Sequence, residues 1–434
     1  MRMKVSLNSE QKVERRLNTV LLPVLAIALA ILYALTNYRG WLIFFVGIAG
    51  AWLLAFVWVE TLQRSIQIER KVHFAWATVG ESVPEQLRLA NHGWLPAIWL
   101  EIVDVSGNVE EPLRLVSDVG SHTTRTRYLN HLYKKRGLYT LGPTRLRTGD
   151  PFGIFTLTVF DQQASAILIT PPLLPLTGLR ISPGGWAGDQ RRRRGIVEWE
   201  ISDNGVRDYV PGDSLRRIHW SASAHSGSLI VRQLESATSG DWWIFLDLED
   251  SVQDGSGLDS TLELSIVLAA SLAVRGLRER RKVGLVLAGP NLVWLEPRAD
   301  PAQRWRILRA LAMAETGKNS LSDLLSLVRP TQAATTILIT PSTETGWIAK
   351  ARRSQSSANT SVFLLDPQEF GGWRDQSRMV SALSYHGLPY TRIPKALLSE
   401  AYASTRQGRR ASPAEMEGGK RYMQQGKTTW ASMD

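Results

Sequence analysis

Residues 242–247 read WWIFLD, and residues 260–280 read STLELSIVLAASLAVRGLRER. The first run is short and apolar up to its final aspartate, as in a buried strand, whereas the second has the length and spacing of a helix. Strands that alternate with helices predict a mostly parallel sheet with helices on both faces over residues 241–404. The further strands are expected at KVGLVLAG (282–289), TTILIT (335–340), SVFLLD (361–366) and PYTRI (389–393), the further helices at 304–315 and 321–328, and a short antiparallel strand at NLVWLEP (291–297).

The chain before this region has a different pattern. Residues 65–175 contain short segments in which apolar and polar residues alternate, such as EQLRLAN (85–91) and IWLEIVDV (98–105), with Gly, Pro or Asn between them. This period of two indicates an antiparallel β-sandwich. Residues 176–240 are interpreted as a linker with a signature segment, and the polar residues 405–434 as a disordered tail.

Two apolar runs near the N-terminus predict a membrane segment over residues 17–59. LNTVLLPVLAIALAILYALT (17–36) and WLIFFVGIAGAWLLAFVWV (41–59) carry no charged side chain, and each approaches the roughly 20 residues that cross a bilayer as a helix. Because only NYRG (37–40) separates them, we expect a tight hairpin of two transmembrane helices. A cleaved signal peptide is the rival interpretation of the first run, but a second apolar run follows it directly.

Cations flank the hairpin on both sides, whereas its loop has only Arg39. The positive-inside rule therefore predicts a multi-pass protein of the cell membrane whose basic N-terminus (1–16) and soluble domains face the cytoplasm. The net charge of +11 agrees with anionic lipid as a neighbour, and the absence of cysteine excludes a disulfide framework and a thiol nucleophile. The flanking cations are Arg2, Lys4, Lys12, Arg15 and Arg16 before the first run, and Arg64, Arg70 and Lys71 after the second.

The end of the first α/β strand offers a candidate metal site. Asp247, Glu249 and Ser251 form D-x-E-x-S, which resembles the D-x-S-x-S loop of von Willebrand factor A-type domains. In such domains a carboxylate and two hydroxyls hold Mg²⁺, and a threonine from a second loop, here Thr340, completes the protein ligands. Because Glu249 and Pro341 depart from that pattern, an ordinary acidic loop is the alternative to a degenerate Mg²⁺ site.

The stretch RDYVPGDSLRRIHWSASA (207–224) gathers acidic, basic and aromatic residues. Asp213, His219 and Ser223 could serve a hydrolase or transferase, but the spacing of His219 from the nearby serines does not favour one helix face. Its arginines and the run RRRR (191–194) could contact nucleic acid, yet no helix-turn-helix, zinc or single-strand-binding signature accompanies them, so no nucleic acid is expected. The favoured interpretation is a buried or interfacial polar clasp held by arginine–carboxylate pairs.

Two motifs carry a resemblance to a known family. The first, Y-x-x-G-D-x-x-R-x-I-H-W-x-x-S-A, is formed by Tyr209, Gly212, Asp213, Arg216, Ile218, His219, Trp220, Ser223 and Ala224. The second, R-G-x-Y-x-L-G-P followed by D-P-F-G, is formed by Arg136, Gly137, Tyr139, Gly142, Pro143, Asp150, Pro151, Phe152 and Gly153. Both resemble the signatures of the bacterial family called domain of unknown function 58, and the resemblance covers nearly the whole chain before the tail.

The resemblance implies a transmembrane hairpin, a β-sandwich and a von Willebrand factor A-like α/β domain. It also implies a partnership with a MoxR-type AAA+ ATPase, together with other von Willebrand A-like proteins, in the assembly or activation of envelope or other protein complexes. We therefore expect a membrane-anchored, non-catalytic interaction or scaffold protein. The alternatives are the hydrolase or transferase named above and a protein that binds lipid or cell-wall precursors in a basic apolar groove beside the hairpin.

Overall fold

The computed structural model describes most of the chain as two compact units, the first ending at Thr170 and the second beginning at Pro171. The run RRRR and most of the expected tail lie outside the described residues. The described residues are 3–8, 11–72, 75–104, 114–174, 206–208, 227–232, 241–328, 334–354 and 359–406, with single positions or pairs at 176, 179, 181, 218, 220, 223–224 and 330.

The strands of the first unit form two antiparallel sheets and a smaller mixed sheet. The six-stranded sheet has the order β1 (Met3–Asn8), β2 (Gln11–Leu17), β11 (Phe155–Asp161), β10 (Thr144–Gly149), β6 (Ala97–Asp104) and β7 (Arg114–Val119). One three-stranded sheet has the order β3 (Ile66–Val72), β5 (Ser82–Asn91) and β8 (Thr123–Leu132). The mixed sheet has the order β4 (Trp76–Thr78), β12 (Ser165–Thr170) and β9 (Gly137–Leu141).

Alternating side chains of the two antiparallel sheets meet in one apolar core. Ile102 and Leu146 from the six-stranded sheet and Leu87 and Leu89 from the three-stranded sheet are all buried there. The alternation in the sequence therefore reflects a sheet with one face on a core. The N-terminal segment, expected as a basic tail, supplies β1 and β2, and Val13 of β2 is buried in the same core.

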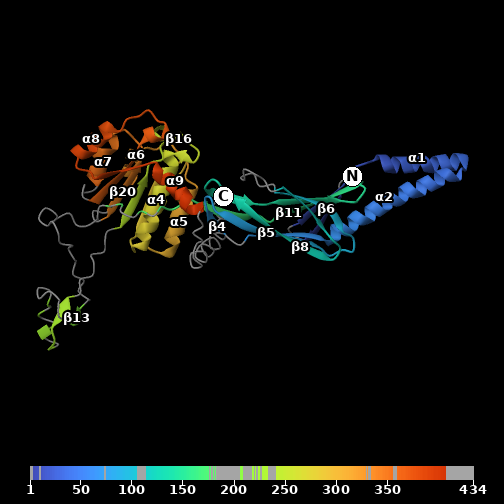
Figure 1. Cartoon of the computed structure of the whole chain (residues 1–434), viewed down its shortest axis with the longest axis horizontal. Helices are drawn as coiled ribbons and strands as arrows, with labels where there is room; N and C mark the ends of the chain where they lie inside the picture. Colours follow the sequence, from blue (N-terminus) through green and yellow to red (C-terminus); the bar gives the residue numbers. More distant parts are fainter. Residues whose placement is uncertain are drawn as a thin grey trace. The chain divides into compact units, whose positions relative to one another are not determined.

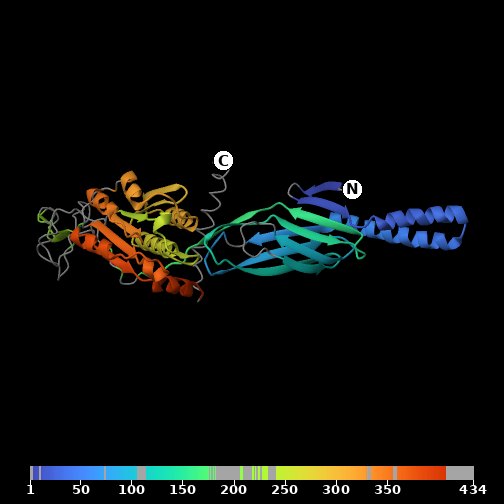
Figure 2. The same ribbon diagram turned by 90° about the horizontal axis from the view of Figure 1, so that it is seen from above.

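Two apolar helices follow β2 and lie side by side (Figures 1 and 2). They are α1 (Leu21–Thr36) and α2 (Arg39–Ser65). Of the two, α2 is long and apolar enough to cross a membrane, whereas α1 has 16 residues. The helix predicted over 17–36 begins later because Leu17 pairs with Phe155 in the sheet. Helix α2 runs beyond the predicted end at 59 because Leu62 is fully buried in the sandwich core.

The second unit is built around a six-stranded sheet with the order β19-β18-β15-β20-β21-β22. All neighbouring strands are parallel except β18 and β19, which confirms the predicted antiparallel strand at the edge. The bounds of the strands are β15 (Trp242–Leu246), β18 (Val283–Ala288), β19 (Leu292–Arg298), β20 (Thr335–Thr340), β21 (Thr360–Leu365) and β22 (Tyr390–Ile393), and a two-stranded ribbon joins β16 (Gly255–Ser256) to β17 (Asp259–Ser260).

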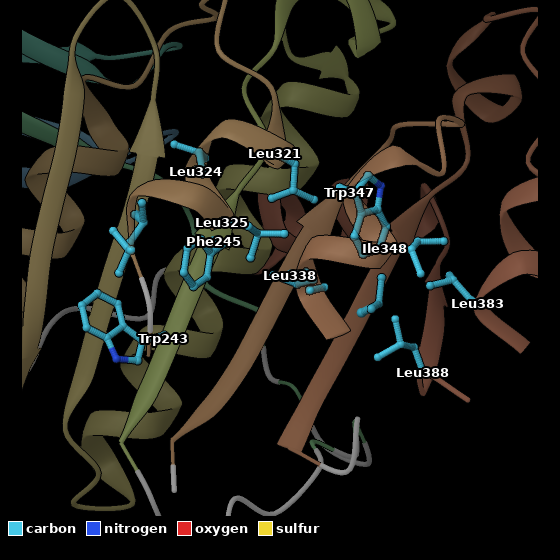
Figure 3. Close-up of a cluster of buried hydrophobic side chains, with 14 of the residues drawn as sticks. Trp243, Phe245, Leu321, Leu324, Leu325, Leu338, Trp347, Ile348, Leu383 and Leu388 are labelled. Carbon is cyan, nitrogen blue, oxygen red and sulfur yellow. The ribbon is translucent and has the colours of Figure 1, made fainter. Parts of the chain in front are cut away.

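Helices cover both faces of this sheet. One face packs on α6 (Leu321–Leu327), α7 (Gly346–Ser354) and α8 (Ser377–Tyr385), and Figure 3 shows Trp243 and Phe245 of β15 in that layer with Leu324 and Trp347. The other face packs on α4 (Thr261–Arg278), whose neighbours are α5 (Pro301–Ala312) and α9 (Ala396–Arg406). Helix α4 is buried along most of its length, which explains why its sequence is apolar on nearly every side. The chain is thus a mixed α/β protein with more than one domain.

Candidate functional site

The first candidate site lies where β15 and β20 end, at the carboxyl edge of the parallel sheet. Asp247 follows β15 directly, and Thr340 is the last residue of β20. The Thr340 hydroxyl donates a 2.6 Å hydrogen bond to Asp247 Oδ2, and both side chains are buried. The backbone of Asp247 also donates to Ile339 O at 3.0 Å, which fixes the register of the two strand ends. Two of the four predicted metal ligands are therefore in direct contact.

Burial strongly perturbs the carboxyl group of Asp247. It raises the pKa of Asp247 to about 6, because the charged form loses its water. Hydrogen bonds from the Thr340 hydroxyl and the Glu249 amide act in the opposite direction, while the negative charges of Glu249 and Glu344 add to the rise. At neutral pH the site therefore holds a poorly solvated negative charge, which a cation would stabilise.

The loop after β15 brings the other two predicted ligands together. The Ser251 hydroxyl donates to the Glu249 carboxylate, and the Glu249 amide donates to Asp247 Oδ1 at 3.3 Å. A neighbouring segment braces this loop, since Gly317 accepts from the Asp250 amide and donates to Leu248 O, both at 2.8 Å. The loop is therefore held by backbone hydrogen bonds on the side that faces Gly317.

Another segment at the carboxyl edge, which includes Arg374, follows β21 and the short 3-10 helix η4 (Pro367–Phe370). The Arg374 guanidinium donates to the Asp254 carboxylate and to Ser251 O. A Cβ on Gly372 would lie only 2.7 Å from Asp254 Cγ, so a larger residue there would displace the Asp254 carboxylate. Between these two anchored positions Trp373 is 88% exposed. Sequence reasoning missed this tryptophan, although the GGW triplet at a strand-to-helix connection is a usable signal.

The donors at the carboxyl edge are oxygen atoms, which is the ligand type that Mg²⁺ requires. However, both carboxylate oxygens of Asp247 already accept hydrogen bonds, and the Glu249 carboxylate accepts one from Ser251. Within the described ranges, no group of three or more His, Asp or Glu residues is arranged to hold a metal ion. The residues therefore fit Mg²⁺ in part, and its binding by Asp247, Glu249, Ser251 and Thr340 stays a prediction.

The second candidate site, the segment Tyr209–Ala224, is described at a few positions. Strands β13 (Val206–Asp208) and β14 (Ile230–Arg232) flank this segment in the sequence and form an antiparallel ribbon, with Asp208 opposite Ile230. Ile218 is buried and Trp220 is 67% exposed, while Ser223 and Ala224 are in a helical conformation. The signature members Tyr209, Gly212, Asp213, Arg216 and His219 lie outside the described residues, so of the alternative catalytic group Asp213, His219 and Ser223 only Ser223 is described.

The first half of the other signature forms the turn between β9 and β10. Gly142 has φ +95°, and a Cβ there would lie 2.4 Å from Gln163 O, so the position needs glycine. A cis peptide bond joins Gly142 to Pro143, and the amide of Gly142 donates a 3.1 Å hydrogen bond to Asp104 Oδ1. Tyr139 packs against Tyr133 with 4.9 Å between ring centroids. Gly142 and Pro143 therefore shape the turn between β9 and β10. Gly137, which follows Arg136, is the first residue of β9 and has φ +149°.

A buried charge cluster lies next to this turn, and sequence reasoning missed it. Arg70 of β3 donates to Glu85 Oε2 at 2.5 Å and to Asp104 Oδ2 at 2.6 Å, so it joins strands of both antiparallel sheets. Burial alone lowers the pKa of Arg70, but the two carboxylates outweigh this effect and raise it. Arg70 was counted above among the cations that flank the hairpin. That assignment is wrong for this residue, because its charge is buried and neutralised within the sandwich.

The second half of the signature, D-P-F-G, forms a loop between β10 and β11 that a single side chain organises. The buried Asp150 carboxylate accepts hydrogen bonds from the amides of Phe152, Ile154 and Phe155, at 2.8, 3.2 and 2.5 Å. Gly153 takes φ +71° within the loop. As a result, Ile154 and Phe155 point into the core while Phe152 is 63% exposed.

Residues 205–371 match the model of the family described as Protein of unknown function DUF58, which confirms the resemblance to that family. The match includes the first motif, at 209–224, and not the second, at 136–153. This part of the chain is therefore assigned to that family. No curated protein matches the chain.

Among solved structures, the chain is similar to a beta-glucosidase from Listeria innocua, solved in complex with gluconolactone, at 12% identity and a TM-score of 0.14. The similarity covers 24% of this chain and 16% of that one. A similarity this weak carries no argument about fold or activity.

Proposed function

We propose that the protein is a membrane-anchored, non-catalytic interaction protein that works with a MoxR-type AAA+ ATPase in the assembly or activation of protein complexes. The observation that carries the proposal is the carboxyl edge of the six-stranded sheet, where Asp247, Thr340 and the exposed Trp373 gather. In open α/β sheets this edge is where ligands bind. The ATPase itself is inferred from the family resemblance.

The membrane anchor is supported by the surface of the hairpin. Helix α1 exposes large apolar side chains along its length and α2 does so as far as Val57, while the turn between them carries the polar residues Asn37 and Arg39. A soluble protein rarely exposes an apolar surface of this extent. We propose that both helices cross the bilayer and that the flanking cations hold both ends of the hairpin on the cytoplasmic side. The exposed apolar residues are Val20, Leu21, Val24, Leu25, Ile27, Ile31, Leu32 and Leu35, and Leu42, Ile43, Phe44, Val46, Leu53, Leu54 and Val57.

The proposed docking domain is von Willebrand factor A-like. This assignment is supported by the strand order, by the antiparallel edge strand β19, and by a carboxylate directly after β15 that accepts a hydrogen bond from a hydroxyl in the last residue of β20. In that class a Mg²⁺ ion at the edge presents an open position to an acidic side chain of a partner. Here the exposed Trp373 adds a large aromatic surface beside the same edge, and tryptophan is enriched among the residues that dominate binding energies.

The test is affinity purification of the full chain from membranes, with and without a non-hydrolysable ATP analogue. We expect an AAA+ ATPase to be recovered with the wild type and to be recovered at least tenfold less with Trp373→Ala. Tyr385→Ala is the matched control, because Tyr385 is 87% exposed but lies at the end of α8, where the chain returns to the opposite edge of the sheet. Equal recovery with Trp373→Ala would exclude this docking edge, and the absence of any AAA+ ATPase would exclude the partner.

A further inference from the structure

We propose that the D-P-F-G loop, Asp150–Gly153, is a second membrane-contact site that inserts Pro151 and Phe152 into the lipid headgroup layer beside the hairpin. The inference rests on the membrane anchoring proposed above and adds a contact made by the sandwich itself. The ligand is the lipid bilayer, and the contact is made at the boundary between headgroups and acyl chains.

The loop lies at the base of the hairpin. Asn18, three residues before α1, donates from its backbone to Ile154 O at 2.9 Å and from its side chain to Gly153 O at 3.1 Å. The apolar surface begins immediately after it, since Val20 and Leu21 are 63% and 69% exposed. Hydrogen bonds from Asn18 therefore join the loop to the segment directly before α1, where the lipid-facing surface starts.

Contacts with α2 place the loop at the same level. The ring of Phe155, directly after the loop, lies 5.7 Å from the ring of Trp52 and 6.1 Å from that of Phe56. Toward the turn of the hairpin, α2 exposes Leu53, whereas toward its C-terminus it is increasingly buried in the sandwich core. The change from lipid-facing to protein-facing surface on α2 thus also occurs beside this loop.

The length of α1 favours a close approach of the base of the hairpin to the bilayer. Sixteen residues rise about 24 Å as a helix, whereas the hydrocarbon core is about 30 Å thick. Because β2 ends at Leu17, the chain has only a few residues between the sandwich and α1. When the adjoining end of the sandwich lies within the headgroup layer, a helix this short crosses with less thinning of the bilayer.

The loop is built to present an aromatic side chain at that position. Three amides held by Asp150 fix its backbone, so little conformational entropy is lost when Phe152 enters the lipid. Transfer of an exposed phenylalanine side chain from water into lipid is favourable. Arg16, exposed on β2 and opposite Thr156 in the sheet, supplies a cation for anionic headgroups nearby.

The test uses the absence of cysteine from the chain, which allows a single environment-sensitive fluorophore to be attached without background. The full chain is reconstituted in vesicles of phosphatidylethanolamine and phosphatidylglycerol that carry doxyl-labelled lipid as a quencher. The label is placed at Phe152→Cys, at Ile27→Cys in the middle of α1, and at Leu132→Cys. Leu132 is 53% exposed at the end of β8 opposite Ser82, about 30 Å along the strand from the end that adjoins the hairpin.

We expect strong quenching and a blue-shifted emission at positions 27 and 152, with shallow-label lipid most effective at 152, and no quenching at position 132. Quenching at 27 without quenching at 152 would overturn the loop inference and leave the anchor intact. No quenching at 27 would overturn the anchor and, with it, this inference. In the double variant Asp150→Ala, Phe152→Cys, quenching should fall at least twofold, because the carboxylate that accepts the hydrogen bonds of the loop amides is removed. Unchanged quenching in the double variant would mean that the label enters lipid without the ordered loop, which would refute the proposal that the loop presents position 152 to the bilayer.

Discussion

The hydroxyl of Thr340 and the carboxylate of Asp247 are 2.6 Å apart, in a hydrogen bond that connects the ends of two neighbouring parallel strands. This contact satisfies one oxygen of a carboxylate that is almost completely removed from water. It does not cancel the cost of burial, because the pKa of Asp247 is still raised to about 6. The first two predictions follow from this pair.

Asp247→Asn should change how stability depends on pH. The folded pKa of about 6 is above the unfolded value of 3.8, so the wild type loses stability as pH rises from about 4 to about 6, by about 3 kcal/mol in total. The asparagine variant lacks this loss, since its amide does not titrate. Urea unfolding in EDTA from pH 4 to pH 8 should show the difference between the variant and the wild type growing by that amount. A difference independent of pH would contradict a raised pKa.

Mg²⁺ should stabilise the wild type and not Asp247→Asn, if the predicted metal site is real. A cation at the carboxyl edge would offset the desolvated charge, and saturating metal at a hundredfold excess over Kd adds about 2.7 kcal/mol. The measurement is the unfolding midpoint at pH 7.5 with and without Mg²⁺. Equal stabilisation of both proteins would place the effect elsewhere, and no stabilisation of the wild type would show that the degenerate loop does not bind Mg²⁺.

Arg70→Met should destabilise the sandwich by about 3–5 kcal/mol, because it leaves Glu85 and Asp104 buried without their cation. Arg88→Met is the control on the neighbouring strand, where a half-exposed arginine lies 3.8 Å from Glu69 and should cost less than about 1 kcal/mol. Replacing the whole cluster with Arg70→Met, Glu85→Gln and Asp104→Asn should recover part of the loss. Chemical unfolding measures all three variants, and equal effects of the two arginine changes would exclude a special role for the buried cluster.

Asp150→Ala should destabilise the first unit by about 2–4 kcal/mol, because the buried amides of Ile154 and Phe155 lose their acceptor. Asp118→Ala is the matched change at an exposed aspartate paired with Arg125, and it should cost less than about 1 kcal/mol. Hydrogen exchange of the amides at 152–155 provides a local measurement. Protection that persists in Asp150→Ala would show that the loop does not depend on this carboxylate.

Gly317→Ala should be poorly tolerated, because its Cβ would lie 2.2 Å from Gly289 O. The expected cost is about 2–3 kcal/mol, with lower protection of the loop after β15 that Gly317 braces. Gly346→Ala at the start of α7 has no atom within 4 Å of the added Cβ, and it should change stability by less than about 0.5 kcal/mol. If both variants unfold at the same midpoint as the wild type, the close approach of the two glycines is not required.

Much of the second unit could be predicted from its sequence because central parallel strands and α4 are buried on all sides. Such segments read as continuous apolar runs, and β15, β18, β20 and β21 lie where those runs predicted them. The contact between Asp247 and Thr340 was also predictable in outline, since parallel strands end at one edge. The short helices α7 and α8 were missed, because their apolar residues are few and their position depends on packing against the sheet.

The first unit contains features that local patterns do not predict. The sequence of β2, QKVERRL, is mostly charged and does not by itself indicate a strand. It forms one because it pairs with β11, which lies far along the chain. The burial of Arg70 likewise depends on two carboxylates from other strands. The exposed Phe152 next to the buried Phe155 follows from the hydrogen bonds of Asp150, which are a property of the folded loop.

Helix α2 continues without a break from the exposed apolar surface of the hairpin into the sandwich, where Ala55, Val59 and Leu62 are inaccessible to solvent. A helix packed in this way acts as a stiff strut, because bending it would open the core around those three residues. The sandwich therefore cannot pivot independently of the hairpin. A force that tilts the hairpin must therefore rotate the sandwich with it as one rigid body.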